Sequence, residues 1–275
     1  MTGRHTSVRL LAGTAIAAGA AGLSWYLARR PVPDAEEITY PPRDVLKSLA
    51  PDLWIVDSGP ISAMGLKLPV RMTVIRLRDG SLLLHSPTQY RDELAEELRA
   101  IGTVRHLVAP TVAHWTYVAE WQRAFPQAKT WAVPALRDRA QVHKAGVRID
   151  GNLRSVTPVE WAGEIQQGLV TGGGGFQEAW FFHKESETLI LADLVQNLEP
   201  DKLPPVTAML MRATVATRAT SGVHVRAVLS LNKDEVKSAV RAMIATEPKR
   251  VIFAHGAFFT ERGAEQLREA FAWLL

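Results

Sequence analysis

The chain contains no cysteine. Disulfide bonds, thiolate nucleophiles and cysteine-ligated metal sites are therefore excluded. The absence does not identify the compartment, because a chain without cysteine tolerates oxidising and reducing conditions alike.

Two common catalytic signatures are also missing. The sequence has no Gly-x-Ser-x-Gly and shows no triad, so it does not indicate a serine hydrolase. The four-glycine tract Gly172–Gly175 lacks the Lys-Ser/Thr of a phosphate-binding loop. The tract therefore predicts a flexible turn near the site and gives little support to a nucleotide pocket.

The folded part of the chain has no excess of positive charge. The formal net charge is +4, and residues 1–30 carry four arginines and no acid. The remainder has 32 − 4 = 28 basic and 28 acidic residues. The domain therefore has no basic footprint for nucleic acid, and we expect none to bind.

The N-terminal segment has the features of a membrane anchor. Leu10 to Leu27 is an uncharged run of 18 residues, flanked by arginines on both sides and followed by Arg29-Arg30. This length just suffices to span a bilayer. Either an uncleaved anchor or the core of a cleaved export signal fits, and the aromatic pair Trp25-Tyr26 favours the anchor. The orientation stays open because both flanks are basic.

The rest divides into a Pro-rich linker, residues 31–50, and one domain, residues 51–275. Apolar residues make up 47% of the chain, enough for a substantial core. Strands are predicted at 53–58 and 72–77, and Asp79-Gly80 indicates a hairpin from the latter to 81–85. Thr88 is expected to cap a helix that stops at Gly102.

Further elements alternate between strand and helix. A helix is predicted over 116–125, a loop over 146–161, and a second hairpin from 177–183 and 188–193. Asn232 with Glu235 resembles a capping box for a helix over 233–246. The pattern favours an α/β (α+β) fold in which two β-rich halves pack face to face with helices outside.

Four strand-like runs lead to a potential ligand. His85, Asp193 and His255 each end an apolar run, and His114 follows the run at 107–110. In layered α/β proteins, ligands bind at the carboxyl ends of such strands. One such residue alone would more often be structural. The recurrence at four strand ends predicts a single polar site.

These residues, in this order, resemble the metallo-β-lactamase superfamily, and more narrowly an uncharacterised branch of it known as a domain of unknown function. The stretches that carry the resemblance run from about Pro51 to Leu275: Arg71-Met72-Thr73, Leu84-His85-Ser86-Pro87, Val108-Ala109-Pro110 with His114, Glu120-Trp121, Phe181-Phe182-His183, Asp193 and Ala254-His255-Gly256. The resemblance implies a four-layer αββα sandwich, here preceded by an N-terminal hydrophobic helix.

The superfamily motif His-x-His-x-Asp-His is altered in this chain. Pro110 and Val112 stand at its leading histidines, His114 at its aspartate and Trp115 at its last histidine. Gly172–Gly175 replaces the later histidine loop. The resemblance therefore implies that the first metal site is lost.

The resemblance implies a second metal site with three protein ligands. They map to His114, Asp193 and His255, an N/O set that suits one divalent ion such as zinc, iron or manganese. His85 replaces a commonly acidic residue and is either a fourth ligand or a partner of the ligands.

Other polar and aromatic residues are expected to be structural. His183 is expected at the surface, Trp115 and Trp121 in the core, and Glu120 on a helix face in preference to lining a pocket.

Two functions remain open. The first is a membrane-tethered hydrolase that activates water on one metal and acts on an ester, thioester or lactone, with the small-molecule substrate unidentified. The second is a non-catalytic protein of the same fold that has lost its metal and binds a ligand or partner. Oligomeric state is not indicated.

Overall fold

The computed structural model describes residues 32–63 and 65–275. In this part of the chain no helix is both long and apolar enough to cross a bilayer. The span expected at residues 10–27 lies outside the described residues. Two stretches of the expected linker are ordered: α2 (Ala35–Ile38), capped by Asp34, and β1 (Lys47–Ala50).

The first sheet has seven strands in sequence order. They are β1, β2 (Leu53–Ala63), β3 (Leu66–Arg76), β4 (Ser81–His85), β5 (Thr103–Ala109), β6 (Lys129–Ala132) and β7 (Gly151–Asn152). β1 to β4 pair antiparallel, and β4 to β7 pair parallel. Gly80 has φ of +79° in the predicted turn between β3 and β4, a conformation that glycine adopts without a steric penalty.

The second sheet has four strands in the order β11-β10-β9-β8. They are β8 (Ile165–Thr171), β9 (Gln177–His183), β10 (Thr188–Ile190) and β11 (Arg250–Ile252). β8, β9 and β10 form an antiparallel meander, which confirms the second hairpin, and β11 adds parallel to β10.

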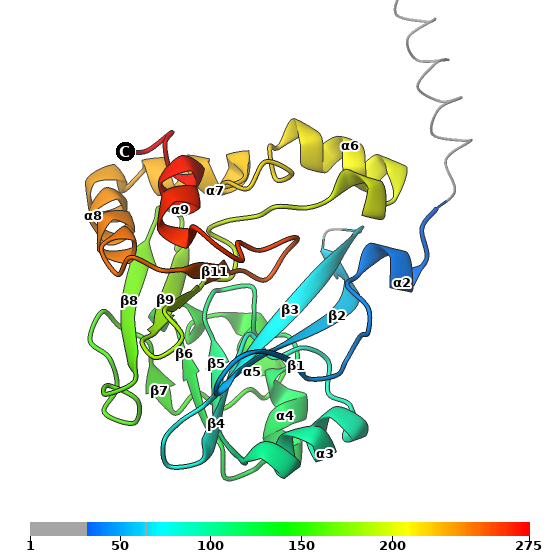
Figure 1. Ribbon diagram of the computed structural model, residues 1–275, viewed down its shortest axis with the longest axis vertical. Coiled ribbons are helices and arrows are strands. Elements are labelled where there is room, and N and C mark those ends of the chain that lie inside the picture. The colour runs from blue at the N-terminus through cyan, green and yellow to red at the C-terminus, as the bar shows by residue number, and fades with distance from the viewer. Residues whose placement is uncertain (1–31, 64) are drawn as a thin grey trace, which may run out of the picture.

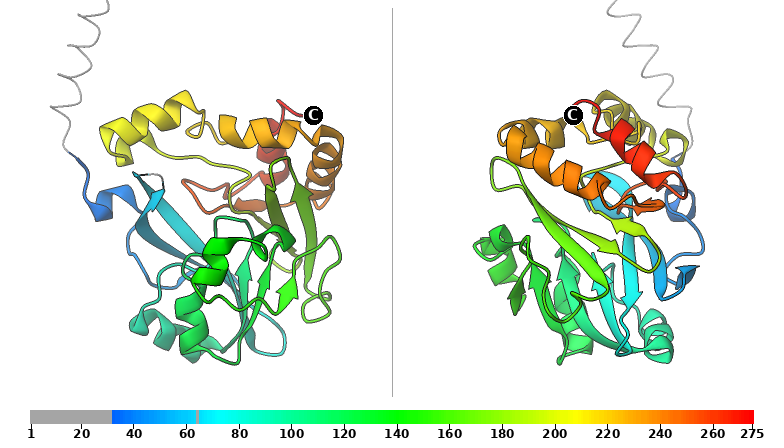
Figure 2. Two further views of the ribbon diagram at one scale, coloured as in Figure 1. Left: turned by 180° about the vertical axis from the view of Figure 1, so that it is seen from behind. Right: turned by 60° about the vertical axis from the view of Figure 1, so that its left-hand side comes forward.

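Helices cover the outer faces of both sheets (Figures 1 and 2). The first sheet carries α3 (Asp92–Ile101), α4 (Val118–Ala124), the 3₁₀ turn η1 (Pro134–Leu136) and α5 (Ala140–Lys144). The second carries α7 (Val223–Ser230), α8 (Lys233–Ile244) and α9 (Gly263–Ala270). η2 (Pro200–Lys202) and α6 (Pro205–Ala213) contact each other, and α6 shares a buried cluster with Leu68 of β3 and Ile38 of α2. The arrangement is the predicted four-layer αββα sandwich.

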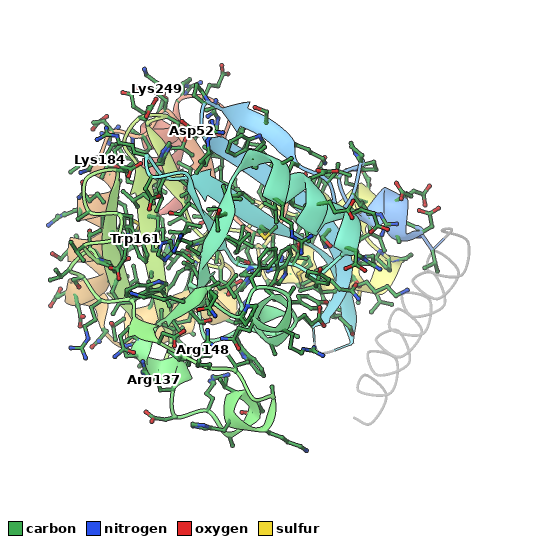
Figure 3. The ribbon with its side chains drawn as sticks, turned by 90° about the horizontal axis from the view of Figure 1, so that it is seen from below. Asp52, Arg137, Arg148, Trp161, Lys184 and Lys249 are labelled. Atoms are coloured by element: carbon green, nitrogen blue, oxygen red, sulfur yellow. The ribbon has the colours of Figure 1, made fainter. Side chains whose placement is uncertain are left out.

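Strand alternation divides the core. On β9, Phe181 joins the cluster between the sheets, whereas Trp180 and Phe182 face the cluster under α8 and α9. Ile190 of β10 and Ile252 of β11 also belong to the cluster between the sheets. Successive side chains of a strand point to opposite faces of the sheet. The second sheet therefore carries buried apolar side chains on both of its faces. Trp161 is buried, and Figure 3 shows Lys184 and Lys249 towards the periphery of the molecule.

Several local expectations were wrong. Thr88 caps no helix, since α3 starts at Asp92, and the Thr88 carbonyl accepts a hydrogen bond from Trp121 Nε1 at 2.7 Å instead. Asn232 begins α8 without a side-chain cap. The expected loop at 146–161 contains β7. His183 is buried, not exposed, because β9 lies between β8 and β10.

Candidate metal centre

His114 is held by the loop that follows β5. Thr111 Oγ1 accepts hydrogen bonds from the backbone N–H groups of Ala113 at 3.0 Å and His114 at 3.2 Å, which forms a tight turn. Ser86 Oγ lies 2.5 Å from His114 Nδ1. With Nδ1 engaged, His114 presents Nε2 to the space between the sheets.

Asp193 follows β10 in a loop fixed by a buried carboxylate. Glu178 on β9 accepts hydrogen bonds from the backbone N–H groups of Ala192, Asp193 and Leu194, at 2.7, 2.8 and 2.9 Å. Thr111 Oγ1 donates to Asp193 Oδ2 at 3.1 Å. The Asp193 side chain therefore has a defined orientation with Oδ1 free for other partners.

His255 follows β11 and is fixed by β3. Its Nδ1 donates to the Pro69 carbonyl at 2.7 Å. Arg71 Nη1 donates to the carbonyls of Phe253 and Gly256, both at 2.9 Å, and so ties down the loop on either side of His255. Nε2 is again the nitrogen left free.

The three side chains converge. His114 Nε2 lies 3.2 Å and His255 Nε2 lies 3.4 Å from Asp193 Oδ1. All three potential ligand atoms lie within 4.8 Å of one another. Three residues from distant parts of the sequence thus form one compact N/N/O set.

The charges of this set are coupled. Burial alone would raise the pKa of the Asp193 carboxyl, but the charge and hydrogen bond of His114, with those of His255, hold that pKa well below its usual range. Burial and the neighbouring charge of Asp193 raise the pKa of Glu178. The pKa values of the two carboxyl groups are thus shifted in opposite directions. Asp193 is the anion that faces the histidines, and Glu178 supports the loop that carries Asp193.

His85 lies outside the three-residue set. The side chain is buried, its ring meets Phe181 edge-on at 5.3 Å between centroids, and its Nε2 has no hydrogen-bond partner. Burial, with the charge of His114, lowers the pKa of His85 to about 3. The sequence placed His85 at this strand end, and the structure gives it an apolar surrounding.

The geometry of the set fits a divalent ion. A tetrahedral zinc ion bound at about 2.0–2.1 Å separates neighbouring ligand atoms by about 3.3 Å. Two of the three separations match that value, since Asp193 Oδ1 lies 3.2 and 3.4 Å from the two Nε2 atoms, and all three atoms lie within 4.8 Å of one another. Both histidines also engage Nδ1 with an oxygen, the usual way of orienting a ligating imidazole.

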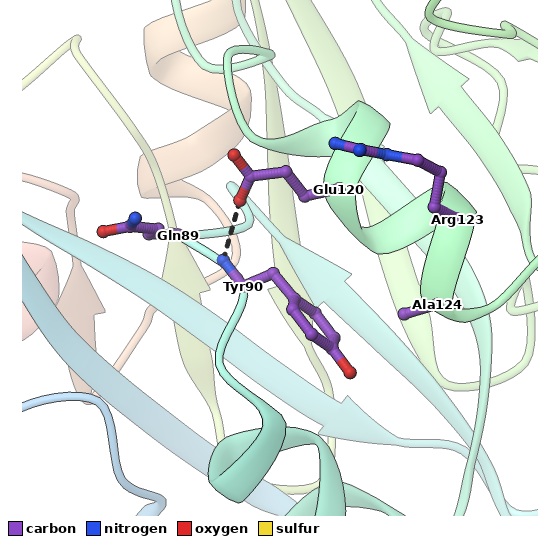
Figure 4. A pocket seen from close by; sticks show the side chains of 5 residues that line it. All are labelled: Gln89, Tyr90, Glu120, Arg123 and Ala124. Carbon is purple, nitrogen blue, oxygen red and sulfur yellow. Dashed lines mark hydrogen bonds between the residues drawn. The ribbon is translucent and has the colours of Figure 1, made fainter.

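A surface hollow of about 510 Å³ lies beside α4, lined by Gln89, Tyr90, Glu120, Arg123 and Ala124 (Figure 4). Glu120 accepts a hydrogen bond from the Tyr90 backbone N–H at 3.0 Å. Glu120 therefore lines a pocket, where the sequence favoured a plain helix-face charge. Trp121 is in the core as expected.

The sequence interpretation gave no supporting role to three residues that orient the site. Ser86 and Arg71 carry no spacing signal, because their partners lie far away in the chain. Glu178 does carry a signal in the sequence, because it is the one carboxylate in a largely apolar strand. A buried acid is rare unless it is paired. Ser86, His114 and Asp193 form a hydrogen-bonded chain, but Ser86 is buried and acts here by orienting the imidazole.

Solved structures confirm the fold. The DIM-1 metallo-β-lactamase exposed to ceftazidime is 12% identical, over 83% of this chain and 96% of that one, with a TM-score of 0.57. The metallo-β-lactamase from Pontibacter korlensis is 13% identical over 83% and 97%, with a TM-score of 0.55. FIM-1 from Pseudomonas aeruginosa, in its mono-zinc form, is 12% identical over 82% and 95%, with a TM-score of 0.53.

No curated protein matches the chain. A family model does, over residues 52–227, a range that contains His85, His114 and Asp193 and ends before His255. The chain has the metallo-β-lactamase fold and belongs to the family described as Domain of unknown function (DUF4336).

Proposed function

We propose that this protein is a membrane-tethered hydrolase that uses one divalent metal ion held by His114, Asp193 and His255. The observation that carries the proposal is the convergence of two Nε2 atoms on one carboxylate oxygen, with both Nδ1 atoms already engaged. A purely structural histidine would not need this matched orientation.

The chain's own residues determine which atoms face the ion. Pro69 and Ser86 fix the imidazoles, and Thr111 holds the second oxygen of Asp193. Zinc, iron or manganese would suit two imidazoles and a carboxylate. Such an ion, when bound with an open position, supplies Lewis acidity and makes water a stronger nucleophile at neutral pH.

A single ion is proposed because Pro110 and Val112 offer no ligand where the superfamily motif has its leading histidines. FIM-1, a protein of the same fold, has been crystallised in a mono-zinc form. The substrate class is proposed by analogy of fold alone, as an ester, thioester or lactone.

The first test measures hydrolysis. The wild-type chain, loaded with zinc, should hydrolyse at least one member of a panel containing a nitrophenyl ester, an acyl thioester and a lactone. Asp193→Ala should lower the rate more than about a hundredfold, because loss of a ligand exceeds the 10–100-fold typical of a supporting residue. His224→Ala, a change at an exposed histidine outside the set, is the matched control.

Zinc binding without turnover of any substrate class would favour the non-catalytic function. The absence of both zinc binding and turnover would remove the hydrolase proposal altogether.

The tether rests on the uncharged run at 10–27 and its flanking arginines. Full-length protein should sediment with membranes and resist carbonate extraction. Recovery of a soluble species shortened at its N-terminus would instead indicate a cleaved export signal.

A further inference from the structure

Exposed apolar side chains gather on the segment between Asp193 and His255. Of the nine large apolar side chains exposed in the described residues, five belong to this segment: Val206, Met209, Leu210, Val223 and Leu231. Scattered single exposures are ordinary on a protein surface, but a concentration in one segment marks an interaction surface.

Helix geometry places most of them together. Val206, Met209 and Leu210 are spaced i, i+3, i+4 on α6 and so share one helix face. The Val223 N–H donates to the Thr214 carbonyl at 2.9 Å, so α7 begins beside the end of α6. Both helices lie along the upper edge of the molecule in Figures 1 and 2. We call the exposed side chains of Val206, Met209, Leu210 and Val223 the α6–α7 face.

The charged residues of the segment that carries this face have one sign. From Lys202 to Lys233 the sequence contains five basic residues and no aspartate or glutamate. Arg212, Arg218 and Lys233 are exposed. In a chain with 28 acidic residues, such a stretch is a distinctive feature of this segment. Apolar side chains bordered by basic ones are typical of surfaces that bind anionic lipid.

The start of the described chain lies beside this face. Ile38 of α2 packs in one buried cluster with Leu203, Ala208 and Ala216. Tyr40 donates a hydrogen bond to Glu199 at 2.6 Å. The uncharged run ends at Leu27, five residues before Val32. Even a fully extended chain of that length spans at most about 18 Å.

We propose that the α6–α7 face docks onto the surface of a bilayer that contains anionic phospholipid, with Val206, Met209, Leu210 and Val223 entering the interface and Arg212 and Arg218 meeting lipid phosphates. The docking fixes how the domain lies on the membrane, independently of the metal chemistry proposed above.

The absence of cysteine makes a direct test available in the full-length chain. Leu210→Cys and Val159→Cys each introduce one thiol for a polarity-sensitive fluorophore, and Val159 is an exposed apolar control outside the face, 88% accessible. Each labelled protein is reconstituted with vesicles of phosphatidylcholine alone or of phosphatidylcholine with phosphatidylglycerol. Lipids with a quencher in the acyl region report contact.

In vesicles with phosphatidylglycerol, the label at 210 should shift its emission to the blue and be quenched severalfold more than the label at 159. Raised salt, or Arg212→Glu with Arg218→Glu, should reduce that quenching. Circular dichroism checks that these exposed changes leave the fold intact.

Equal exposure of both labels to water would overturn the proposal, and so would equal quenching of both. A blue shift at 210 without vesicles that grows with protein concentration would assign the face to a second copy of the chain, and would also overturn it. Flotation with phosphatidylcholine vesicles reports the tether at 10–27 separately, so failure of the tether and failure of the docking are distinguishable.

Discussion

Arg71 combines a buried charge with the positioning of a proposed ligand. Its guanidinium pairs with Asp57 at 2.7 Å, and both side chains are about 3–4% exposed. The same group donates to the two carbonyls that flank the His255 turn. Loss of this one side chain would leave Asp57 buried with Lys47 as its remaining ion-pair partner.

Arg71→Met should therefore lower the free energy of unfolding by about 3–5 kcal/mol, the cost of breaking a buried ion pair from one side. Arg76→Met is the matched control on the same strand, because Arg76 pairs with Asp52 at the surface, where a pair contributes at most about 1 kcal/mol. Urea unfolding of both variants measures the difference. Equal effects would contradict the role given to Arg71.

His85 makes stability depend on pH. Its pKa falls from 6.5 to about 3 on folding, mainly through burial, so below pH 6.5 the unfolded chain binds the proton more readily. The resulting stability is fully present above pH 6.5 and is lost as the pH falls towards 3.

His85→Gln should remove this contribution. Between pH 6.5 and 5 the wild type should lose about 1.6 kcal/mol more of its free energy of unfolding than the variant does, because the unfolded histidine goes from half to fully protonated over this range. Denaturant unfolding at the two pH values measures it. Parallel pH profiles would show that His85 is already protonated or solvated in the folded state.

At the scale of elements, the loops after β5, β10 and β11 carry the site, and their backbone geometry decides where the side chains point. Gly256 follows His255 with φ of +94°, and a Cβ there would stand 2.1 Å from the Asn197 carbonyl oxygen. Only glycine allows the His255 loop to approach so closely.

Gly256→Ala should shift this loop, lower zinc affinity at least about tenfold, and destabilise the fold by about 1–3 kcal/mol. Gly146→Ala separates the two causes, because Gly146 has φ of +67° with open space around it. Gly146→Ala should lower the free energy of unfolding only by the strain of its backbone conformation, and it should leave the zinc affinity unchanged. Calorimetric titration with zinc measures both variants, and unchanged affinity in Gly256→Ala would contradict the account.

The sequence predicted the elements that depend on local pattern. Apolar runs located most strands of both sheets but not β1, β7 or β8, and Asp79-Gly80 located the turn that joins β3 to β4. Strand ends also brought His114, Asp193 and His255 to one site, because the carboxyl ends of such strands meet at one edge.

The errors came from tertiary contacts. Thr88 would cap a helix by its type alone, but the loop at 86–91 is held by Trp121 and Glu120 from α4. His183 looked like a hairpin residue and is buried because strands flank it on both sides. Glu178 and Arg71 act through partners remote in sequence, which one chain alone does not indicate.

At the scale of the whole molecule, the loops that carry the three proposed ligands are built on two packed sheets. The apolar clusters between the sheets and under α8 and α9 contain most of the large buried side chains. Burial of such side chains contributes about 1.5–3 kcal/mol each. The fold should therefore persist when the site is altered, and loss of metal can be measured in a folded protein.

The metal content of the purified protein tests the central claim most directly. After expression with supplemented zinc, elemental analysis of the wild type should give one equivalent of zinc, iron or manganese per chain. His114→Ala and Asp193→Ala should each lose most of it, His224→Ala should keep it, and all should retain their circular dichroism. A wild type that carries no metal and shows no rise in melting temperature with added zinc would contradict the account, and so would one that carries two equivalents.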